Sequence, residues 1–184
     1  MYAGTLSGDK EAIDFLRQAA EIFGSTPAGE RFKGMLANRQ IIGQAMEIAG
    51  PTLEGKTFEL ASLKGKVILV DFWATWCGPC VGELPSVKKV YEKYREQGFE
   101  VVAISLDDDR AALEKFVKDR QVPWVQIIFT EEKDRGWENP LARRYGIDSI
   151  PATFLIGRDG KVVARDLRGE KQLEEAVTAA LKKQ

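Results

Sequence analysis

Histidine is absent from this 184-residue chain, and its absence excludes several kinds of active site. A chain without an imidazole has no Ser-His-Asp triad, no Cys-His pair and no histidine ligand for a metal ion. Cysteine is scarce as well, since only Cys77 and Cys80 are present. This pair cannot fill the ligand shell of a structural zinc site. Any chemistry must therefore use thiols, carboxylates, lysines or hydroxyls.

An excess of charge and a long apolar run are also missing. Lys and Arg number 27 against 28 Asp and Glu, so the formal net charge is −1 and gives no electrostatic basis for binding nucleic acid or an anionic membrane. No apolar run approaches the roughly 18 residues that span a bilayer, and the N-terminus lacks the pattern of a secretory signal. Two explanations stay open: the protein is cytosolic, or a leader has been removed and Met1 stems from recombinant expression.

The composition, with 44% hydrophobic and 30% charged residues, suits one globular domain with a small additional element. Residues 1–48 have the apolar spacing of helices, first after Ser7 to Asp9 and again after Thr26-Pro27, a typical N-cap followed by proline. We expect a helical extension or the remnant of a preceding domain. The apolar positions that indicate it are Ile13, Leu16, Ala20, Phe23, Phe32, Met35, Leu36, Ile42 and Met46.

Helical and extended patterns alternate over residues 51–184, which predicts an α/β domain with helices on both faces of a central sheet. An apolar run interrupted only by Asp71 predicts a buried strand at 67–73. The cluster Asp107-Asp108-Asp109 is typical of a helix cap. Further strands are expected at 57–60, 99–106, 125–129, 152–156 and 162–166, with a hairpin turn at 157–160 and helices after residues 80 and 109, at 141–145 and at the C-terminus.

The two cysteines lie directly after the predicted buried strand and directly before a predicted helix. At a helix N-terminus the free N–H groups and the dipole lower the pKa of a thiol, so Cys77 is the expected nucleophile. Cys80 is expected to be more buried and to attack the mixed disulfide that Cys77 forms. Gly78 and Pro79 allow a tight turn between the two cysteines, and both are candidates for the surface that binds the substrate. A structural staple is disfavoured because the loop between the cysteines is so short. An inert buried thiol pair is disfavoured because CxxC near a βαβ pattern, in a chain without histidine, is a specific redox signature.

Two carboxylates are placed to accept the proton of Cys80. Asp71 lies inside the apolar strand, where burial should raise its pKa towards neutrality. Glu83 follows Cys80 by one helical turn and can face the same pocket, although a solvent-exposed helix position would explain it equally well.

Aromatic and proline residues near the thiols are candidates for substrate binding. Trp73 is expected in the core, whereas Trp76 adjoins the cysteines and is a candidate for docking a substrate. Ile150-Pro151 precedes the strand at 152–156, and a cis bond there would bring backbone close to the site. Because X-Pro bonds are usually trans, the spacing alone does not establish this geometry.

Residues 70–80, VDFWATWCGPC, resemble the active-site segment of thioredoxin-fold oxidoreductases. The lead-in at 55–58 and 63–66 and the segments 145–147, 150–156 and 159–161 resemble the TlpA/ResA-like branch of that family. The resemblance covers the domain at 51–184 and leaves residues 1–48 outside it. It implies a thioredoxin-like fold, with a central mixed sheet, additional N-terminal strands and an inserted αβ unit.

The resemblance also implies roles for individual residues. Pro151 matches the cis-proline beside the thiols, with Ile150 lining the substrate groove. Glu83 matches the active-site glutamate of ResA-like proteins, and Asp71 matches the buried aspartate of thioredoxin. The presence of both acids leaves open which one handles the proton of Cys80. Members of this branch are typically exported and reduce envelope proteins, including apocytochromes, which favours an extracytoplasmic location over a cytoplasmic one.

We therefore expect a thiol-disulfide oxidoreductase that reduces protein disulfides outside the cytoplasm. It would use no cofactor or metal beyond its Cys77–Cys80 pair, act as a monomer, and exchange electrons with disulfide-containing client proteins and an upstream thiol donor. One alternative is a redox-responsive docking module of a larger envelope protein. A thiol peroxidase is disfavoured because the position that should carry threonine is Ala74, with Thr75 displaced by one. A copper-handling redox chaperone would lack its histidine ligand.

Overall fold

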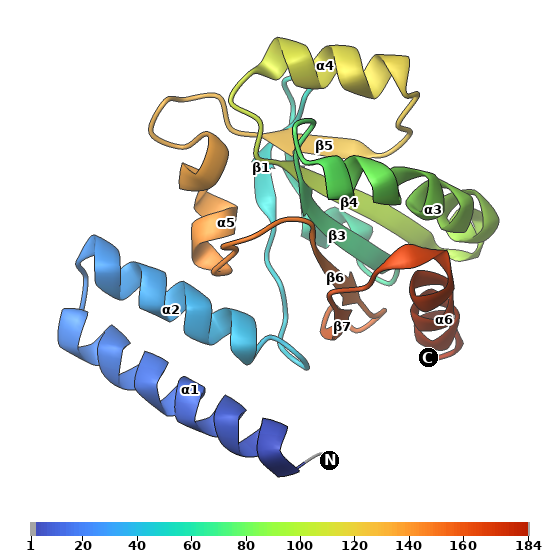
Figure 1. Cartoon of the computed structure of the whole chain (residues 1–184). Coiled ribbons are helices and arrows are strands. Elements are labelled where there is room, and N and C mark those ends of the chain that lie inside the picture. The colour runs from blue at the N-terminus through green and yellow to red at the C-terminus, as the bar shows by residue number, and fades with distance from the viewer. Residues whose placement is uncertain (1–2, 184) are drawn as a thin grey trace.

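A five-stranded mixed sheet in the order β5-β4-β3-β6-β7 forms the centre of the molecule (Figure 1). The computed structural model describes residues 3–183, with side chains from residue 10 onward. Strands β3, β4 and β5 are parallel, whereas β6 pairs antiparallel with β3 and with β7. The expected strands are confirmed as β3 (Val67–Trp73), β4 (Phe99–Ser105), β5 (Val125–Ile128), β6 (Ala152–Ile156) and β7 (Val162–Arg165).

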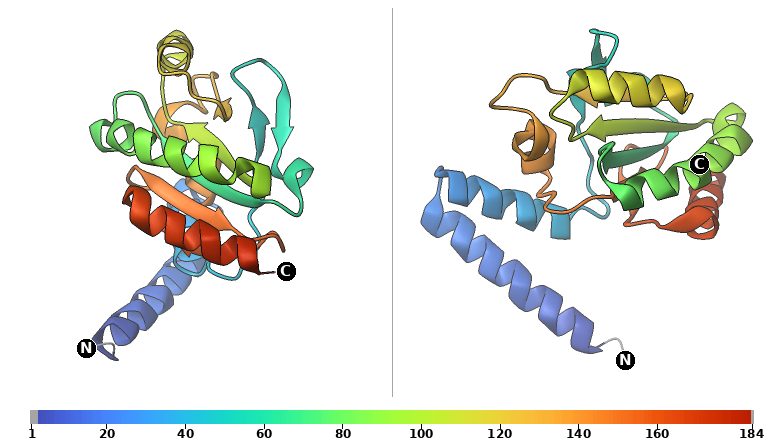
Figure 2. Two further views of the ribbon diagram at one scale, coloured as in Figure 1. Left: turned by 90° about the vertical axis from the view of Figure 1, so that its right-hand side faces the viewer. Right: turned by 45° about the horizontal axis from the view of Figure 1, so that its top comes forward.

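Helices cover both faces of this sheet, which confirms the α/β fold class (Figures 1 and 2). On one face, α3 packs against α6, and the Phe116 ring of α4 lies 5.5 Å from the Trp73 ring of β3. The short helix α5 lies on the other side of the sheet. The helices are α3 (Gly78–Tyr94), α4 (Arg110–Asp119), α5 (Pro140–Arg144) and α6 (Gly169–Lys182), and 3-10 turns lie at η1 (Leu60–Leu63), η2 (Arg95–Gln97) and η3 (Gly136–Glu138).

Gly50 and Pro51 lie in a short strand beside the main sheet. β1 (Ala49–Pro51) pairs antiparallel with β2 (Thr57–Glu59), and Thr52 forms a bridge with Ile127 of β5. The absence of a side chain on Gly50 permits this packing, because a Cβ there would lie 2.8 Å from the Ile127 Cγ2 atom. The small β1-β2 sheet therefore adjoins the edge of the main sheet.

The N-terminal segment forms a helical hairpin, α1 (Ala3–Phe23) and α2 (Pro27–Arg39). The predicted cap at Thr26 is confirmed, since its side chain accepts a hydrogen bond from the Gly29 N–H at 3.2 Å. The expectation of helix up to residue 48 is wrong. Beyond Arg39 the backbone pairs with β7: the Gly43 N–H donates to the Val162 carbonyl at 2.8 Å, and the Val162 N–H donates to the Gln44 carbonyl at 2.9 Å. α1 also begins earlier than Ser7 to Asp9.

Helix α2 docks through backbone contacts against the end of α5 and the residues that follow it. A Cβ on Gly34 would lie 2.3 Å from the Arg143 carbonyl oxygen, and one on Gly146 would lie 2.4 Å from the Gly34 carbonyl. The Asn38 side-chain amide donates to the Tyr145 carbonyl at 2.7 Å. α2 is thus held directly on the body of the molecule, with α1 packed on its outer side (Figure 2). No helix within residues 3–183 is long and apolar enough to cross a membrane.

Candidate redox site

Cys77 and Cys80 lie at the start of helix α3, shortly after the end of strand β3, as predicted. Cys77 is the N-cap of α3, and its sulfur accepts a hydrogen bond from the Cys80 N–H at 3.2 Å. The two cysteines form a disulfide with an S–S distance of 2.03 Å. The expectation that Cys80 is the more buried of the two is wrong, because Cys77 is 5% and Cys80 6% exposed.

The segment that precedes β6 approaches the Cys77 side of the disulfide. The Ile150-Pro151 bond is cis, as the family resemblance implied. The Cys77 Sγ lies 3.8 Å from the Ile150 carbonyl oxygen. Gly78 and Pro79, the first residues of α3, are exposed next to this contact. The four candidates for substrate binding on these two segments, Gly78, Pro79, Ile150 and Pro151, therefore lie close to Cys77.

Behind the disulfide lies a small cavity that Asp71, Cys80, Glu83 and Arg168 help to line. It has about 10 Å³ available to the centre of a water molecule, which is roughly enough for one water. The Oδ1 atom of Asp71 is buried and has no hydrogen-bond partner within residues 3–183. The structure thus brings both predicted acids to the same cavity as Cys80, on its inner side.

Burial raises the pKa of Asp71 from 3.8 to about 7. The positive charge of Arg168 opposes this shift, and the negative charge of Glu83 adds to it. A carboxyl group with this pKa changes protonation in the range where thiols exchange protons. Asp71 can therefore act as either a proton acceptor or a proton donor near neutral pH.

Glu83 has a hydrogen-bond partner that Asp71 lacks. Its Oε2 atom accepts a hydrogen bond from the Gly169 N–H at 2.8 Å, at the first residue of α6. A carboxylate at this position satisfies a free backbone donor and interacts favourably with the helix dipole. Glu83 therefore links α3 to α6 beside the cavity.

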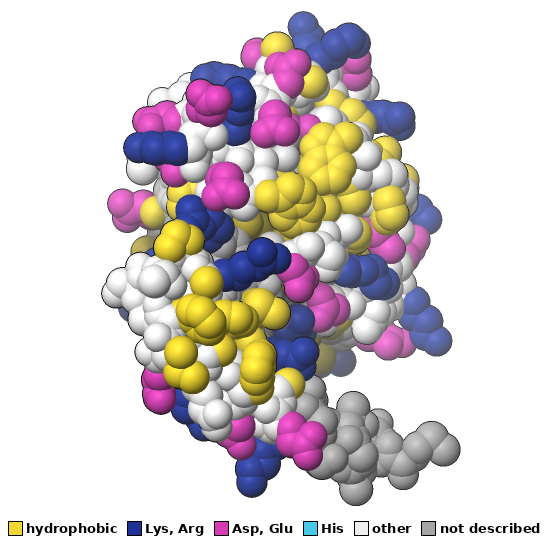
Figure 3. All heavy atoms as spheres, turned by 60° about the vertical axis from the view of Figure 1, so that its left-hand side comes forward, with side chains coloured by type: hydrophobic (Ala, Val, Ile, Leu, Met, Phe, Trp, Pro, Cys, Tyr) yellow, Lys and Arg dark blue, Asp and Glu magenta, His cyan; other side chains and the backbone are white. Residues whose placement is uncertain are grey.

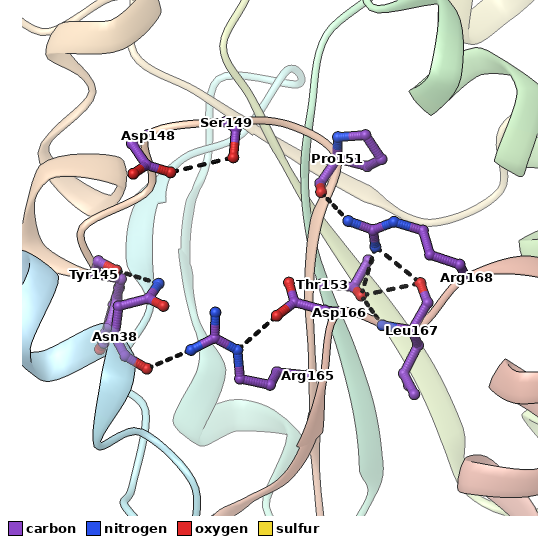
Figure 4. A network of polar contacts seen from close by, with 10 residues as sticks. All are labelled: Asn38, Tyr145, Asp148, Ser149, Pro151, Thr153, Arg165, Asp166, Leu167 and Arg168. Atoms are coloured by element: carbon purple, nitrogen blue, oxygen red, sulfur yellow. Dashed lines mark hydrogen bonds and ion pairs between the residues drawn. The ribbon is translucent and has the colours of Figure 1, made fainter. Parts of the chain in front are cut away.

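Arg168 is a site residue that the sequence analysis missed. Its guanidinium donates to the carbonyl oxygens of Pro151 and Leu167 and to the Thr153 hydroxyl, so that it ties the cis-proline to the start of α6 (Figure 4). One signal in the sequence could have identified it. A cation just before a helix opposes the helix dipole, so its presence before residue 169 calls for another role.

A polar cleft of about 610 Å³ opens on the other side of Pro151, between α2 and β7. Arg165 crosses it, donating to the Asn38 carbonyl at 2.7 Å and pairing with the Asp166 carboxylate at 2.7 Å (Figure 4). Arg168 lines both this cleft and the small cavity behind Cys80. The N-terminal hairpin thus contributes to a cleft that reaches the cis-proline.

The tryptophans are placed as the sequence predicted, and a further one joins them. Trp73 is buried, and its indole N–H donates to the Gln126 Oε1 atom at 3.0 Å. Trp76 is 54% exposed, and its ring centroid lies 6.3 Å from that of Trp137 in η3. The sequence gave no reason to connect Trp137 with the thiols, because 60 intervening residues separate it from Trp76.

An acid of the 107–109 cluster fixes the loop that leads into the thiol pair. Asp109 caps α4 as expected, accepting hydrogen bonds from the N–H groups of Ala111 and Ala112. Asp107 is buried and accepts from the Thr75 N–H at 3.1 Å and from the Thr75 hydroxyl at 2.5 Å. Thr75 is thus committed to Asp107.

The geometry suits two-electron exchange between thiols and disulfides. Cys77 is flanked in the sequence by the exposed residues Trp76 and Gly78, and Cys80 lines the cavity that also holds the Asp71 carboxyl group, whose pKa is about 7. No group of three or more Cys, Asp or Glu side chains in the described part of the chain could hold a metal ion. The Cys77–Cys80 disulfide is a group that can exchange two electrons with another thiol pair.

Comparison with known proteins gives consistent matches. The Redoxin family model matches residues 39–181. A thiol-disulfide oxidoreductase ResA of Bacillus thuringiensis subsp. konkukian is 40% identical over 126 residues, which cover 67% of this chain and 68% of the relative. Among solved structures, the thioredoxin domain of a Bacteroides vulgatus thiol-disulfide oxidoreductase matches with a TM-score of 0.69 and 28% identity, covering 77% of this chain and 98% of that one.

A second structure gives the same result. A putative thiol:disulfide interchange protein DsbE from Chlorobium tepidum matches with a TM-score of 0.66 and 30% identity, over 76% of this chain and 96% of that one. The helical hairpin α1–α2 lies almost wholly before the region that the family model matches.

Proposed function

Since this chain belongs to the Redoxin family and is a thiol-disulfide oxidoreductase of the TlpA/ResA-like group, we propose that residues 51–184 reduce protein disulfides outside the cytoplasm through the Cys77–Cys80 dithiol. The observation that carries the proposal is the asymmetry around the thiols. Cys77 caps a helix beside the cis-proline, and Cys80 adjoins a cavity with an unpartnered carboxylate oxygen.

The proposed cycle begins with the reduced protein. The Cys77 thiolate attacks one sulfur of a client disulfide, which forms a mixed disulfide and expels the other client sulfur as a thiolate. The Cys80 thiol then loses its proton, and its sulfur attacks the Cys77 sulfur. The mixed disulfide breaks, the second client thiol leaves, and the protein retains the Cys77–Cys80 disulfide. The two electrons come from the protein dithiol, which an upstream thiol donor restores.

We assign the proton of Cys80 to Asp71 and a positioning role to Glu83. The unpartnered Oδ1 atom of Asp71 and its pKa of about 7 support the first assignment. The hydrogen bond between the Gly169 N–H and the Glu83 carboxylate supports the second. A single water in the cavity would be sufficient to bridge Asp71 and the Cys80 sulfur.

The client is proposed to bind across Trp76, Gly78, Pro79 and the Ile150-Pro151 segment, all of which lie at the rim beside Cys77. The resemblance to the exported TlpA/ResA-like branch supports a location outside the cytoplasm. The protein is proposed to act on client proteins as a monomer and to require no further cofactor. Fractionation of native cells, with the protein detected by an antibody, tests the compartment.

Catalysis is tested by the reduction of insulin with dithiothreitol as the electron source. We expect the protein to accelerate the reduction well beyond dithiothreitol alone, and the Cys77→Ser variant to give only the background rate. Activity no greater than background for the wild-type protein would leave a redox-responsive docking role as the better account.

A further inference from the structure

Two exposed indole rings adjoin each other beside the reactive disulfide. Trp76, the residue before Cys77, is 54% exposed, and Trp137 is 45% exposed. Their ring centroids lie 6.3 Å apart with an interplanar angle of 54°. Figure 3 shows hydrophobic side chains gathered in separate groups on this side of the molecule, one of them over the N-terminal helices. Large exposed aromatic side chains that lie together are a feature of surfaces that bind a partner.

Hydrogen bonds of Asn139 fix the backbone that follows Trp137. Asn139 is buried, and its side-chain oxygen accepts hydrogen bonds from the Leu141 and Ala142 N–H groups at 2.9 and 3.2 Å. Its side-chain nitrogen donates to the Ser105 carbonyl at the end of β4, at 3.4 Å. The turn that carries Trp137 is therefore anchored to the same sheet that carries the thiols. A preorganised aromatic side chain loses little entropy on binding a partner.

A cleft of about 740 Å³ continues from Trp137 between α2 and α5. Its apolar lining includes Pro27, Phe32, Met35 and Ile147. Met35 is a flexible side chain that can adapt to different apolar partners. An extended segment lying on the two indoles can therefore continue along an apolar path that the N-terminal hairpin helps to form.

The charged residues of this cleft balance one another. Arg31 and Arg143 are matched by Glu138 and Asp148, and the Arg143 guanidinium pairs with the Glu138 carboxylate at 3.4 Å. A lining without net charge does not favour a strongly acidic or basic ligand. It suits an uncharged, apolar stretch of polypeptide.

We propose that Trp76 and Trp137 together bind a large apolar side chain of the client, close in sequence to the client cysteine that Cys77 attacks, and that the cleft between α2 and α5 holds the adjoining residues. This inference rests on the proposed reduction of protein disulfides. The occupant follows from the position of the site, since Trp76 directly precedes Cys77 and a polypeptide whose sulfur bonds to Cys77 has its neighbouring residues beside the exposed indoles. Trp137 then becomes a determinant of client specificity, in contact with Trp76.

The test compares two disulfide-linked peptides that differ only beside the attacked cysteine, one with leucine and one with serine. The ratio of their kcat/KM values is measured for the wild-type protein, for Trp137→Ala and for Trp137→Phe. The control is Ile22→Ala, which removes a side chain that is 77% exposed on α1. We expect the wild-type protein to prefer the leucine peptide about tenfold, since tenfold corresponds to about 1.4 kcal/mol, an amount typical of a partly buried aromatic contact.

Trp137→Ala should remove most of this preference, Trp137→Phe should restore part of it, and Ile22→Ala should leave it unchanged. An unchanged preference in Trp137→Ala, or an equal loss in Ile22→Ala, would overturn the proposal. So would a wild-type dimer that dissociates in Trp137→Ala, because the indoles would then bind a second copy. Reduction of a small aromatic disulfide by the wild-type protein distinguishes failure of the proposed function from failure of the proposed docking site. If the wild-type protein does not reduce this compound, the proposed function fails. If it does, a negative result with the peptides counts against the docking site alone.

Discussion

At the scale of single residues, Asp71 and Glu83 differ in what their carboxylates contact. Both line the cavity behind Cys80, but only Glu83 has a backbone donor bound to it, whereas the Oδ1 atom of Asp71 is buried without a partner among the described residues. An unsatisfied buried oxygen costs free energy, so its retention favours a role in proton transfer. This difference could not be predicted from spacing, because both acids lie within a few residues of the thiols in the sequence.

Substitution of the two acids should separate their roles. In the wild-type protein, the rate of Cys80 attack should rise as the pH passes about 7, because Asp71 accepts the proton only when ionised. Asp71→Asn should lose this inflection and follow the ionisation of the Cys80 thiol at higher pH. Glu83→Gln should keep the inflection and move it to lower pH, since the charge of Glu83 raises the pKa of Asp71.

The measurement for this prediction is stopped-flow release of a chromogenic thiol from its mixed disulfide with Cys77, over a range of pH. Arg168→Met provides the opposite shift, because the charge of Arg168 lowers the pKa of Asp71. Loss of the inflection in Glu83→Gln, with its retention in Asp71→Asn, would reverse the two assignments.

The order of attack of the two sulfurs gives a second prediction at this scale. Cys77 caps α3 and lies 3.8 Å from the Ile150 carbonyl oxygen, whereas Cys80 adjoins the inner cavity. We expect Cys80→Ser to accumulate mixed disulfides with client proteins and Cys77→Ser to form none. Non-reducing gels of native cell extracts, followed by mass spectrometry of the trapped species, make the comparison. Trapping by Cys77→Ser alone would mean that Cys80 is the nucleophile.

How much of the site could be predicted depends on how local its residues are. Cys77, Cys80 and Asp71 are recognisable because a strand, a turn and a helix follow one another in the sequence. Trp137 and Arg168 come from distant segments, and only the folded chain brings Trp137 to Trp76 and Arg168 to Pro151.

At the scale of elements, the same distinction between local and distant contacts explains the N-terminal segment. The cap at Thr26 is local and was predicted correctly. The end of α2 at Arg39 was not, because Ile42 and Met46 continue the helical spacing although Ile42 is exposed and only Met46 is buried. Residues 43 and 44 exchange backbone hydrogen bonds with Val162 of β7, and Met46 is buried there without a helix. Periodicity alone cannot separate these two outcomes.

The docking of α2 gives a prediction for this element. A methyl group on Gly34 would lie 2.3 Å from the Arg143 carbonyl oxygen, so Gly34→Ala must move α2 away from the end of α5. We expect it to lower the free energy of unfolding by about 1–3 kcal/mol, as overpacking does. Urea denaturation followed by circular dichroism measures the change.

Gly82→Ala in α3 is the matched control for this prediction. Gly82 is also a helical glycine, but a Cβ there meets nothing within 4 Å. Since alanine is the better helix former, this variant should be as stable as the wild-type protein or more stable by up to about 1 kcal/mol. Equal stabilisation of both variants would show that α2 does not pack closely on the body in solution.

At the scale of the whole molecule, Asp71 also links stability to pH. Its pKa rises from 3.8 to about 7 on folding, so the folded protein retains a proton that the unfolded chain releases between these values. The contribution to stability is therefore fully present below about pH 4, is lost as the pH rises towards 7, and changes little above that. A shift of this size corresponds to a loss on the order of 4 kcal/mol.

The cost of holding an ionised carboxylate behind the disulfide can be measured directly. We expect the difference in unfolding free energy between Asp71→Asn and the oxidised wild-type protein to grow in favour of the variant from pH 4 to pH 8, by roughly 2 kcal/mol or more. Urea titrations at several pH values give this difference, in which the titration of all other carboxylates cancels. A difference that stays constant with pH would mean that Asp71 ionises equally in the folded and unfolded chains. The predicted slope, together with loss of the kinetic inflection in the same variant, would show that the fold gives up stability to keep a proton acceptor beside Cys80.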